Sequence, residues 1–428
     1  MVGIRKSIYE LIQIGCCFLC FLLIESCVSN SEAIFPWNEE FSIEQNIAKN
    51  ALALENNTEF HFLDNIVRNR SVLIIGETSH WDYTTIETRI KMIDYLKNKG
   101  FSSIALEGAP LLTSYVFSNP KYAELTKNWK INQFWKLNDL RDPKFQPFLE
   151  SIQNRNIKIW GIDCCWGYYY DIDAVKTILE EYSEHEVLSL DWDRLRHLYF
   201  QKFVMIPCRG CPEPEDKLSV AEQYELMRMI DKISNHTQFI ITSKGTNMDL
   251  KIILQWIRNL NMAFSYVEYA YLTVGSGANL TNRNRDYQMA ENINWIIKNF
   301  PKERFTVWTA NFHGAKDISQ TLHTRDSLLY FSFQSMGETL YAEHENKIYS
   351  LAFTSLEEER WRGRLEMEIA NATENAPFAF INFEPLRFAD GYRDKEFESN
   401  VIGKKSGKWL YIFDGLYYVR DQEYPKNQ

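Results

Sequence analysis

The stretch Val72-Leu-Ile-Ile-Gly-Glu-Thr-Ser-His80 decides the fold, because four apolar residues end at a glycine and give way to polar ones. Such a run is typical of a buried parallel strand that delivers polar side chains to the carboxyl edge of a sheet, where open α/β folds bind ligands. Residues 83–99 then carry apolar side chains at helical spacings, and Gly100 ends this predicted helix. Segment 101–107 predicts a second strand, so the sequence indicates a βαβ unit with acids, Glu77 and Glu107, after its strands.

Later segments end in polar residues in the same way. Segment 157–163 predicts a strand that ends in Asp163, and segment 305–310 predicts one that is followed by Asn311 and His313. Segments 347–353, 409–413 and 417–419 predict further strands, whereas residues 173–300 show apolar positions at helical spacings. We therefore expect an α/β fold with a central, mainly parallel sheet flanked by helices, and a helical insertion subdomain that covers the strand ends.

The first 27 residues resemble an export signal, since Arg5 and Lys6 precede an apolar run over residues 12–24. The sequence Ile24-Glu-Ser-Cys27 resembles a bacterial lipobox and predicts that Cys27 is acylated, with a plain signal or anchor helix as the alternative. We expect an exported lipoprotein, anchored to a bacterial membrane on the periplasmic or outer-membrane side. The expected order is a signal over 1–27, a tether over 28–42, a first core part over 43–172, the helical insertion over 173–300 and a second core part over 301–428.

The net charge and the cysteines indicate which partners and which cysteine chemistry to expect. The net charge of −10 and the lack of a basic stripe argue against a nucleic-acid partner, and no protein partner is predicted. Two cysteine pairs follow the signal, and in an exported protein they favour disulfides over a metal site. These four residues are Cys164, Cys165, Cys208 and Cys211.

Six short motifs in a fixed order resemble the erythromycin esterase family. Each is weak alone, but together they cover most of the chain after the signal, apart from the insertion. They are Gly76-Glu-Thr-Ser-His80, Ala105-Leu-Glu-Gly108, Trp160-Gly-Ile-Asp163, Arg285-Asp-x-x-Met-Ala-Glu-Asn292, Trp308-Thr-Ala-Asn-x-His313 and Ser335-Met-Gly-x-x-Leu340.

The resemblance implies an α/β core, a helical subdomain and a deep cleft between them. It also implies hydrolysis of a macrolide lactone or a related small-molecule ester, with antibiotic resistance as one role and without a cofactor or a metal. The residues that it marks as catalytic are Glu77, His80, Glu107 and His313, and those expected to bind substrate are Arg89, Arg285 and Trp81.

The chemistry of these residue types agrees with this assignment. Ester hydrolysis by water needs a base with a pKa near neutrality, and histidine is the side chain that starts there. We expect His80 to take the proton, with Glu77 or Glu107 orienting its ring. The tetrahedral oxyanion needs a positive or donating partner, for which His313, Arg89 or Arg285 is suited. Asp163 is expected to fix the end of its strand.

Two departures from the family pattern leave alternatives open. Ala310 stands where many relatives have a histidine, and Trp81 stands where glycine is usual. Alanine can neither transfer a proton nor donate to an oxyanion, so a lipoprotein that binds a small molecule without turnover is the main alternative. A metal-dependent hydrolase is a further alternative, although no His-x-x-x-His pair supports it.

Overall fold

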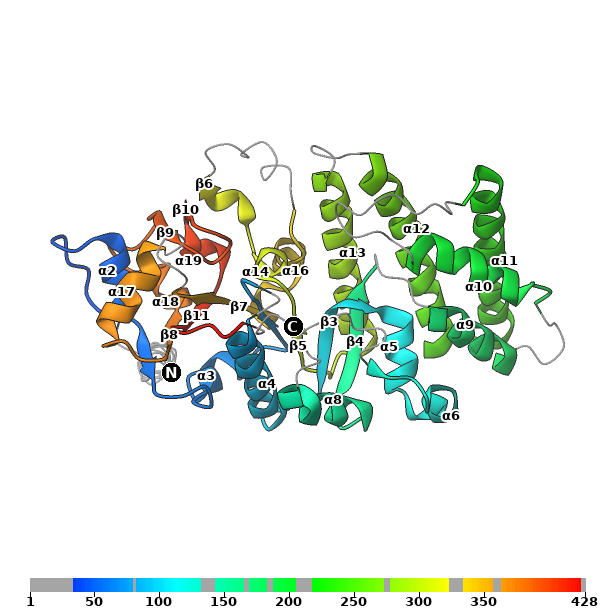
Figure 1. Ribbon diagram of the computed structural model, residues 1–428, viewed down its shortest axis with the longest axis horizontal. Coiled ribbons are helices and arrows are strands. Elements are labelled where there is room, and N and C mark those ends of the chain that lie inside the picture. The colour runs from blue at the N-terminus through cyan, green and yellow to red at the C-terminus, as the bar shows by residue number, and fades with distance from the viewer. Residues whose placement is uncertain are drawn as a thin grey trace, which may run out of the picture.

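The computed structural model describes residues 34–79, 82–131, 143–164, 169–182, 188–204, 218–272, 278–322, 334–356 and 363–424. Within these residues the central sheet has eight strands in the order β1-β8-β11-β7-β2-β5-β3-β4 (Figure 1). The neighbours from β11 to β4 run parallel, and β8 and β1 add antiparallel pairings at one edge. The predicted mainly parallel α/β sheet is confirmed. Its strands are β1 (Leu52–Leu54), β2 (Val72–Ile75), β3 (Ser103–Pro110), β4 (Lys158–Asp163), β5 (Phe305–Trp308), β7 (Ile348–Ser355), β8 (Phe378–Asn382) and β11 (Gly415–Val419).

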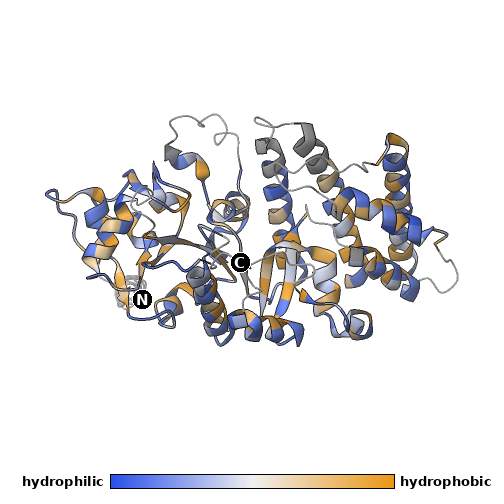
Figure 2. Cartoon of the chain, viewed as in Figure 1, coloured by the Kyte–Doolittle hydropathy of each residue, from blue (hydrophilic) through white to orange (hydrophobic). Residues whose placement is uncertain are grey.

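Strand β2 and the following helix α4 (Tyr83–Lys97) form as the opening stretch predicts. All four residues of β2 are buried, in keeping with a strand covered on both faces. Asp82 caps α4 by accepting a hydrogen bond from the Thr84 backbone N–H, and Gly100 follows the helix with a φ of 87°. Figure 2 shows hydrophobic residues on the central strands and alternating hydrophobic and hydrophilic sides on the helices.

The described elements between β4 and β5 are helices, which gather beyond β4 in Figure 1. The helical character predicted for residues 173–300 is thus confirmed where the chain is described, while the division into domains stays a prediction. Helix α13 packs against β4 and against α12. These helices are α9 (Tyr169–Tyr182), α10 (Trp192–Tyr199), the π-helix η4 (Phe200–Val204), α11 (Val220–Lys244), α12 (Met248–Leu272) and α13 (Ala278–Asn299).

Shorter elements complete the two ends of the sheet. A small sheet has the order β6-β10-β9, and its strands β9 and β10 lie near α19, on the same side of the molecule as β8 and β11 (Figure 1). The described elements that remain are α2 (Ile43–Ala48), α3 (Leu63–Val67), α5 (Leu111–Ser118), η1 (Pro120–Tyr122), α6 (Ala123–Thr126), η3 (Pro143–Phe145), α8 (Gln146–Gln153), α14 (Asn311–Gly314), η5 (Ile318–Gln320), β6 (Thr321–Leu322), α16 (Met336–His344), η6 (Glu345–Lys347), α17 (Arg364–Ala372), α18 (Phe383–Leu386), β9 (Phe397–Ser399), β10 (Lys405–Gly407) and α19 (Trp409–Ile412).

The strand predicted over residues 409–413 is wrong, because this segment forms helix α19. Its apolar run is short, and a short buried run is compatible with either a strand or a helix. The fold decides in favour of the helix, since Trp409, Leu410 and Ile412 are all buried and the Trp409 indole donates to the Phe397 carbonyl at 2.9 Å.

Predictions about the signal and the cysteines fall largely outside the described residues. Cys27, Cys165, Cys208 and Cys211 lie there, whereas Cys164 is buried directly after β4. In the described part of the chain, no helix combines the length and the hydrophobicity that a membrane crossing needs. The disulfide pairing and the acylation of Cys27 stay predictions.

Candidate active site

The polar ends of four strands meet at one edge of the sheet. The neighbours β2, β5, β3 and β4 are parallel, so the residues at their carboxyl ends share that edge. Glu77 follows β2, Glu107 lies in β3, Asp163 ends β4, and residues 309–313 follow β5. The strand order thus confirms that the segments picked from the sequence converge.

Glu107 lies where β3 bends away from its neighbour. The pairing of β3 with β4 shifts register between Leu106 and Pro110, and Gly108 has a φ of 75°, which favours glycine. One carboxylate oxygen of Glu107, Oε2, accepts hydrogen bonds from Thr309 Oγ1 at 2.7 Å and from the Ala310 backbone N–H at 2.9 Å. These two bonds direct the other oxygen, Oε1, toward the helical side of the site.

Arg285 reaches the same point from helix α13. Its Nη2 donates to Glu107 Oε1 at 2.8 Å, and its Nε and Nη2 both donate to the Asp163 carboxylate, with an Nη2–Oδ2 distance of 2.5 Å. Asp163 also accepts from the Gly108 backbone N–H at 3.1 Å. Asp163 therefore fixes the end of its strand, as expected, and also fixes the guanidinium.

His313 completes this cluster from the short helix α14. Its Nε2 lies 3.3 Å from Glu107 Oε1 and 3.1 Å from Arg285 Nη1, while its Nδ1 lies 2.7 Å from Asp286 Oδ1. Burial alone would lower the pKa of His313, but the carboxylates of Asp286 and Glu107 raise it to about 10.

The two partners of His313 Nε2 suit different protonation states. Arg285 Nη1 can only donate, so its hydrogen bond requires a ring without a proton on Nε2. Glu107 Oε1 can accept a proton from Nε2, which suits the imidazolium. In both states Nδ1 keeps its proton and donates it in a hydrogen bond to Asp286 Oδ1. The site therefore offers a partner to His313 Nε2 both before and after a proton transfer.

Glu77 and Arg89 form a buried ion pair directly behind this edge. Their carboxylate and guanidinium are in contact, and both side chains are almost completely buried. Arg89 Nη2 donates to the Ile75 carbonyl at 3.0 Å and to the Thr309 carbonyl at 3.4 Å, and its guanidinium lies 4.0 Å from the ring centre of Trp308. The pair thus ties α4 to the ends of β2 and β5.

Asn311, after the end of β5, links this edge to β7 and to the segment that follows β9. Its side-chain amide donates to the carbonyls of Phe353 and Val401, at 2.7 and 2.8 Å. Gly76 must be glycine here, since a Cβ at that position would lie 2.0 Å from Asn311 Oδ1. Asn311 therefore has a structural role at the edge of the sheet, whereas the acid–base groups come from neighbouring residues.

The structure brings together three of the residues that the sequence marked. Glu107, Arg285 and His313 contact one another, and their side chains are 12%, 13% and 10% exposed. The prediction that Arg89 contacts substrate needs correction, because its side chain has no exposed surface and is enclosed by Glu77, Trp308 and backbone carbonyls. His80 and Trp81 lie outside the described residues.

Two residues that bind the cluster were not predicted from the sequence. Asp286 binds His313, and Thr309 binds Glu107. A signal for Asp286 was present, because it lies on the apolar stripe of α13 that includes Met289, Ala290 and Ile293, and an acid at such a position is normally paired. Thr309 carries no such signal, since a threonine after a strand is common.

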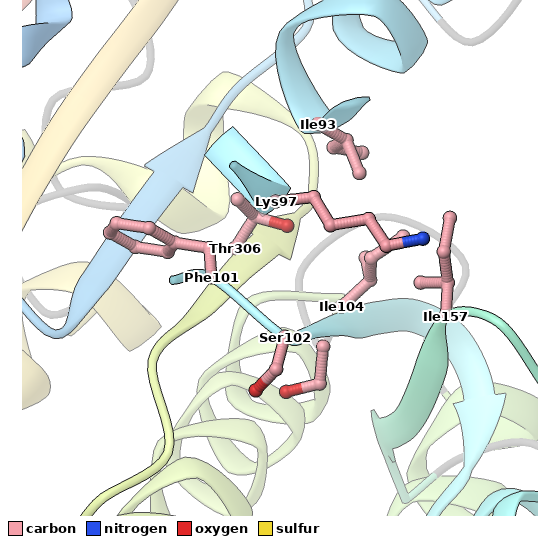
Figure 3. A pocket seen from close by; sticks show the side chains of 8 residues that line it. Ile93, Lys97, Phe101, Ser102, Ile104, Ile157 and Thr306 are labelled. Carbon is pink, nitrogen blue, oxygen red and sulfur yellow. The ribbon is translucent and has the colours of Figure 1, made fainter. Parts of the chain in front are cut away.

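The amino ends of the central strands form the opposite edge of the sheet. A small hollow lies there, at the amino ends of β3, β4 and β5 (Figure 3). Its described lining contains one charged side chain and neither a carboxylate nor a histidine, so it offers no acid–base pair. The lining residues are Ile93, Lys97, Phe101, Ser102, Ser103, Ile104, Ile157 and Thr306.

The cluster at the carboxyl edge suits reactions in which water attacks a carbonyl group. It combines a carboxylate, a fixed guanidinium and an imidazole whose partners can exchange, which are groups that move protons and stabilise an oxyanion. Within the described residues, no set of three or more candidate metal ligands is arranged to hold an ion.

Comparisons with solved structures show the same fold in three proteins. A Bacillus cereus protein superposes with a TM-score of 0.65 at 15% identity, over 90% of this chain and 98% of its own. A succinoglycan biosynthesis protein gives 0.59 at 13% identity, over 89% and 96%. An erythromycin esterase, EreC, carrying a histidine-to-asparagine substitution and in its open conformation, gives 0.60 at 14% identity, over 88% and 98%.

The family assignment depends on a different comparison. No curated protein matches the chain. The model of the family described as erythromycin esterase matches residues 96–373, which is more than half of the chain and includes Glu107, Arg285 and His313. The chain therefore belongs to the erythromycin esterase family, a family of ester hydrolases.

Proposed function

We propose that this protein hydrolyses a carboxylic ester or a lactone by activating water at the Glu107–Arg285–His313 cluster. The observation that carries the proposal is the position of Glu107 Oε1, which lies 2.8 Å from Arg285 Nη2 and 3.3 Å from His313 Nε2. An acid, a guanidinium and an imidazole in contact at the carboxyl edge of the sheet can activate water and stabilise the oxyanion of acyl transfer.

In the proposed reaction, water attacks the carbonyl carbon while a base takes its proton. The sequence assigns His80 as this base. The carbonyl oxygen becomes an oxyanion, and Arg285 Nη1 and His313 Nε2, 3.1 Å apart, are the donors nearest to it. Collapse of the tetrahedral intermediate breaks the carbon–oxygen bond, and the leaving alkoxide takes the proton back from the base.

Ala310 supports a second candidate function, which is binding of a small molecule without turnover. Its backbone N–H donates to Glu107 Oε2 at 2.9 Å, so position 310 adjoins the carboxylate that contacts Arg285 and His313. The family pattern has a histidine at this position in many relatives. A missing donor of this kind lowers the rate of acyl transfer by about 10²–10³-fold in other enzymes.

We also propose that the protein is exported and anchored through a lipid on Cys27. The support is the basic, apolar and lipobox-like order of the first 27 residues. Mass spectrometry of the mature amino terminus tests it, and a mature chain that still begins at Met1 would exclude it.

The experiment for the proposed hydrolysis is a screen of esters and lactones, macrolides included, with wild type, His80→Ala and His313→Gln. His61→Ala is the matched control, since His61 is exposed and its contacts are Asp64 and Tyr95, outside the cluster. We expect turnover by wild type and the control and a large loss in the other two variants. Turnover that is unchanged in His80→Ala and His313→Gln would overturn the mechanism, and binding without turnover would favour the second candidate.

A further inference from the structure

Asp286 occupies a buried position on the far side of His313 from Glu107. Its side chain has no exposed surface, and its Oδ1 lies 2.7 Å from His313 Nδ1. Its second oxygen, Oδ2, accepts a hydrogen bond from the Met336 backbone N–H at 3.0 Å. Both carboxylate oxygens are therefore engaged, one by the imidazole and one by the first residue of helix α16.

The start of α16 is packed tightly against the segment that carries His313. Ser335 caps the helix, since its Oγ accepts from the Glu338 backbone N–H at 3.1 Å, and it also binds the Ala315 carbonyl. A Cβ on Gly337 would lie 2.4 Å from the Gly314 carbonyl oxygen, so only glycine permits this approach. This packing explains the Ser335-Met-Gly motif, which the sequence showed without a role.

The amino terminus of α16 contacts the Asp286 carboxylate. The helix dipole and the Met336 N–H both stabilise a carboxylate there. A charged Asp286 in turn keeps the proton on His313 Nδ1, which leaves Nε2 facing Glu107 and Arg285. The charged groups that contact the ring in the described residues are therefore Asp286 and Arg285 from α13 and Glu107 from β3.

We propose that Asp286, anchored by the amino terminus of α16, is the positioning residue that fixes the orientation of the His313 ring and the proton on its Nδ1. The catalytic meaning of this arrangement rests on the proposed hydrolysis. The orientation of the ring and its proton affinity are properties of the protein without substrate. They can therefore be measured whether or not the protein hydrolyses an ester.

The test is a pH titration of histidine side chains by nuclear magnetic resonance, with the His313 signal identified by its absence in His313→Gln. Asp286→Asn keeps the shape of the side chain and removes its charge. We expect His313 in this variant to lose its proton at a pH about one to three units lower than in wild type, the usual effect of removing one adjacent opposite charge. A titration of His313 identical to that of wild type would overturn the proposal.

Two substitutions at Met336 keep the test decisive if Asp286→Asn does not fold. Met336→Pro removes the backbone N–H at the first helical position, where proline is tolerated, whereas Met336→Ala removes the side chain and keeps the N–H. We expect a lower proton affinity of His313 in Met336→Pro than in Met336→Ala. Equal titrations in the two variants would overturn the role of α16, and neither result depends on the outcome of the hydrolysis screen.

Discussion

Arg285 and Asp163 form a paired contact in which two nitrogens of one guanidinium bind one carboxylate. Arg285 Nε lies 3.1 and 3.2 Å from the two oxygens of Asp163, and Nη2 lies 2.5 Å from one of them. This geometry fixes the plane of the guanidinium and leaves Nη1 directed at His313. Asp163 itself has no exposed side-chain surface. We therefore expect the effects of substitutions at Arg285 and Asp163 on the free energy of unfolding to depend on each other.

Removal of Arg285 should therefore deprive the buried carboxylate of Asp163 of this guanidinium. We expect Arg285→Gln to lower the free energy of unfolding by roughly 3–5 kcal/mol, as for other broken buried pairs, in urea unfolding experiments. Because Asp163→Asn removes the charge that is left over, the double variant should lose less stability than the sum of the two single variants. Additive losses would contradict the coupling.

The protonated state of His313 should make stability depend on pH. Its carboxylate partners raise its pKa from the ordinary 6.5 to about 10, so the folded state binds the proton more tightly than the unfolded state. The stabilising contribution is complete below pH 6.5 and is lost as pH rises through 10. It amounts to at most roughly 5 kcal/mol, because one pKa unit corresponds to about 1.4 kcal/mol.

This pH dependence can be measured against a histidine variant. The stability difference between wild type and His313→Gln should be largest near pH 6 and should shrink steadily toward pH 10. His61→Gln is the control, since His61 is exposed and its difference from wild type should stay small throughout. A difference for His313→Gln that is constant or grows with pH would show that its ring is neutral in the folded protein.

Ala310 offers a gain-of-function test of the site. It is partly exposed, and its backbone N–H is bound to Glu107, so a larger side chain there would begin beside the cluster. If the site hydrolyses esters, Ala310→His should raise kcat, by up to about 10²-fold if the new imidazole acts as an oxyanion donor. Ala310→Leu, which adds bulk without a donor, is the control. An equal change in kcat for both variants would rule out this role.

The central parallel strands and their polar carboxyl ends could be predicted from the sequence, because each such strand is a short apolar run followed directly by polar residues. The apolar run before Glu77 and the glycine-ended helix after it fix β2 and α4 through periodicity and turn chemistry alone. The antiparallel strand β8 was not predicted, and residues 409–413 were misassigned as a strand, because the pairing and packing of short segments depend on distant parts of the chain.

The roles of charged residues were harder to predict, because local sequence does not give burial directly. Arg89 was expected to bind substrate, yet it lies between Ile86 and Ile93 on the buried stripe of α4. Asp286 likewise lies on the buried stripe of α13. A charged residue at an apolar stripe position therefore indicates a buried pair, but its partner becomes visible only when the strand ends are brought together.

The measurement that tests the central claim most directly is kcat/KM for ester or lactone hydrolysis by Glu107→Gln. The matched control is Glu303→Gln, since Glu303 is similarly buried, with 10% side-chain exposure, and is bonded to Lys158 and Trp160 outside the cluster. We predict a loss of about 10²-fold or more for Glu107→Gln, because Glu107 contacts both proposed oxyanion donors, Arg285 and His313, and near wild-type activity for the control. Full activity in Glu107→Gln, or an equal loss in both variants, would contradict the assignment of this cluster as the active site.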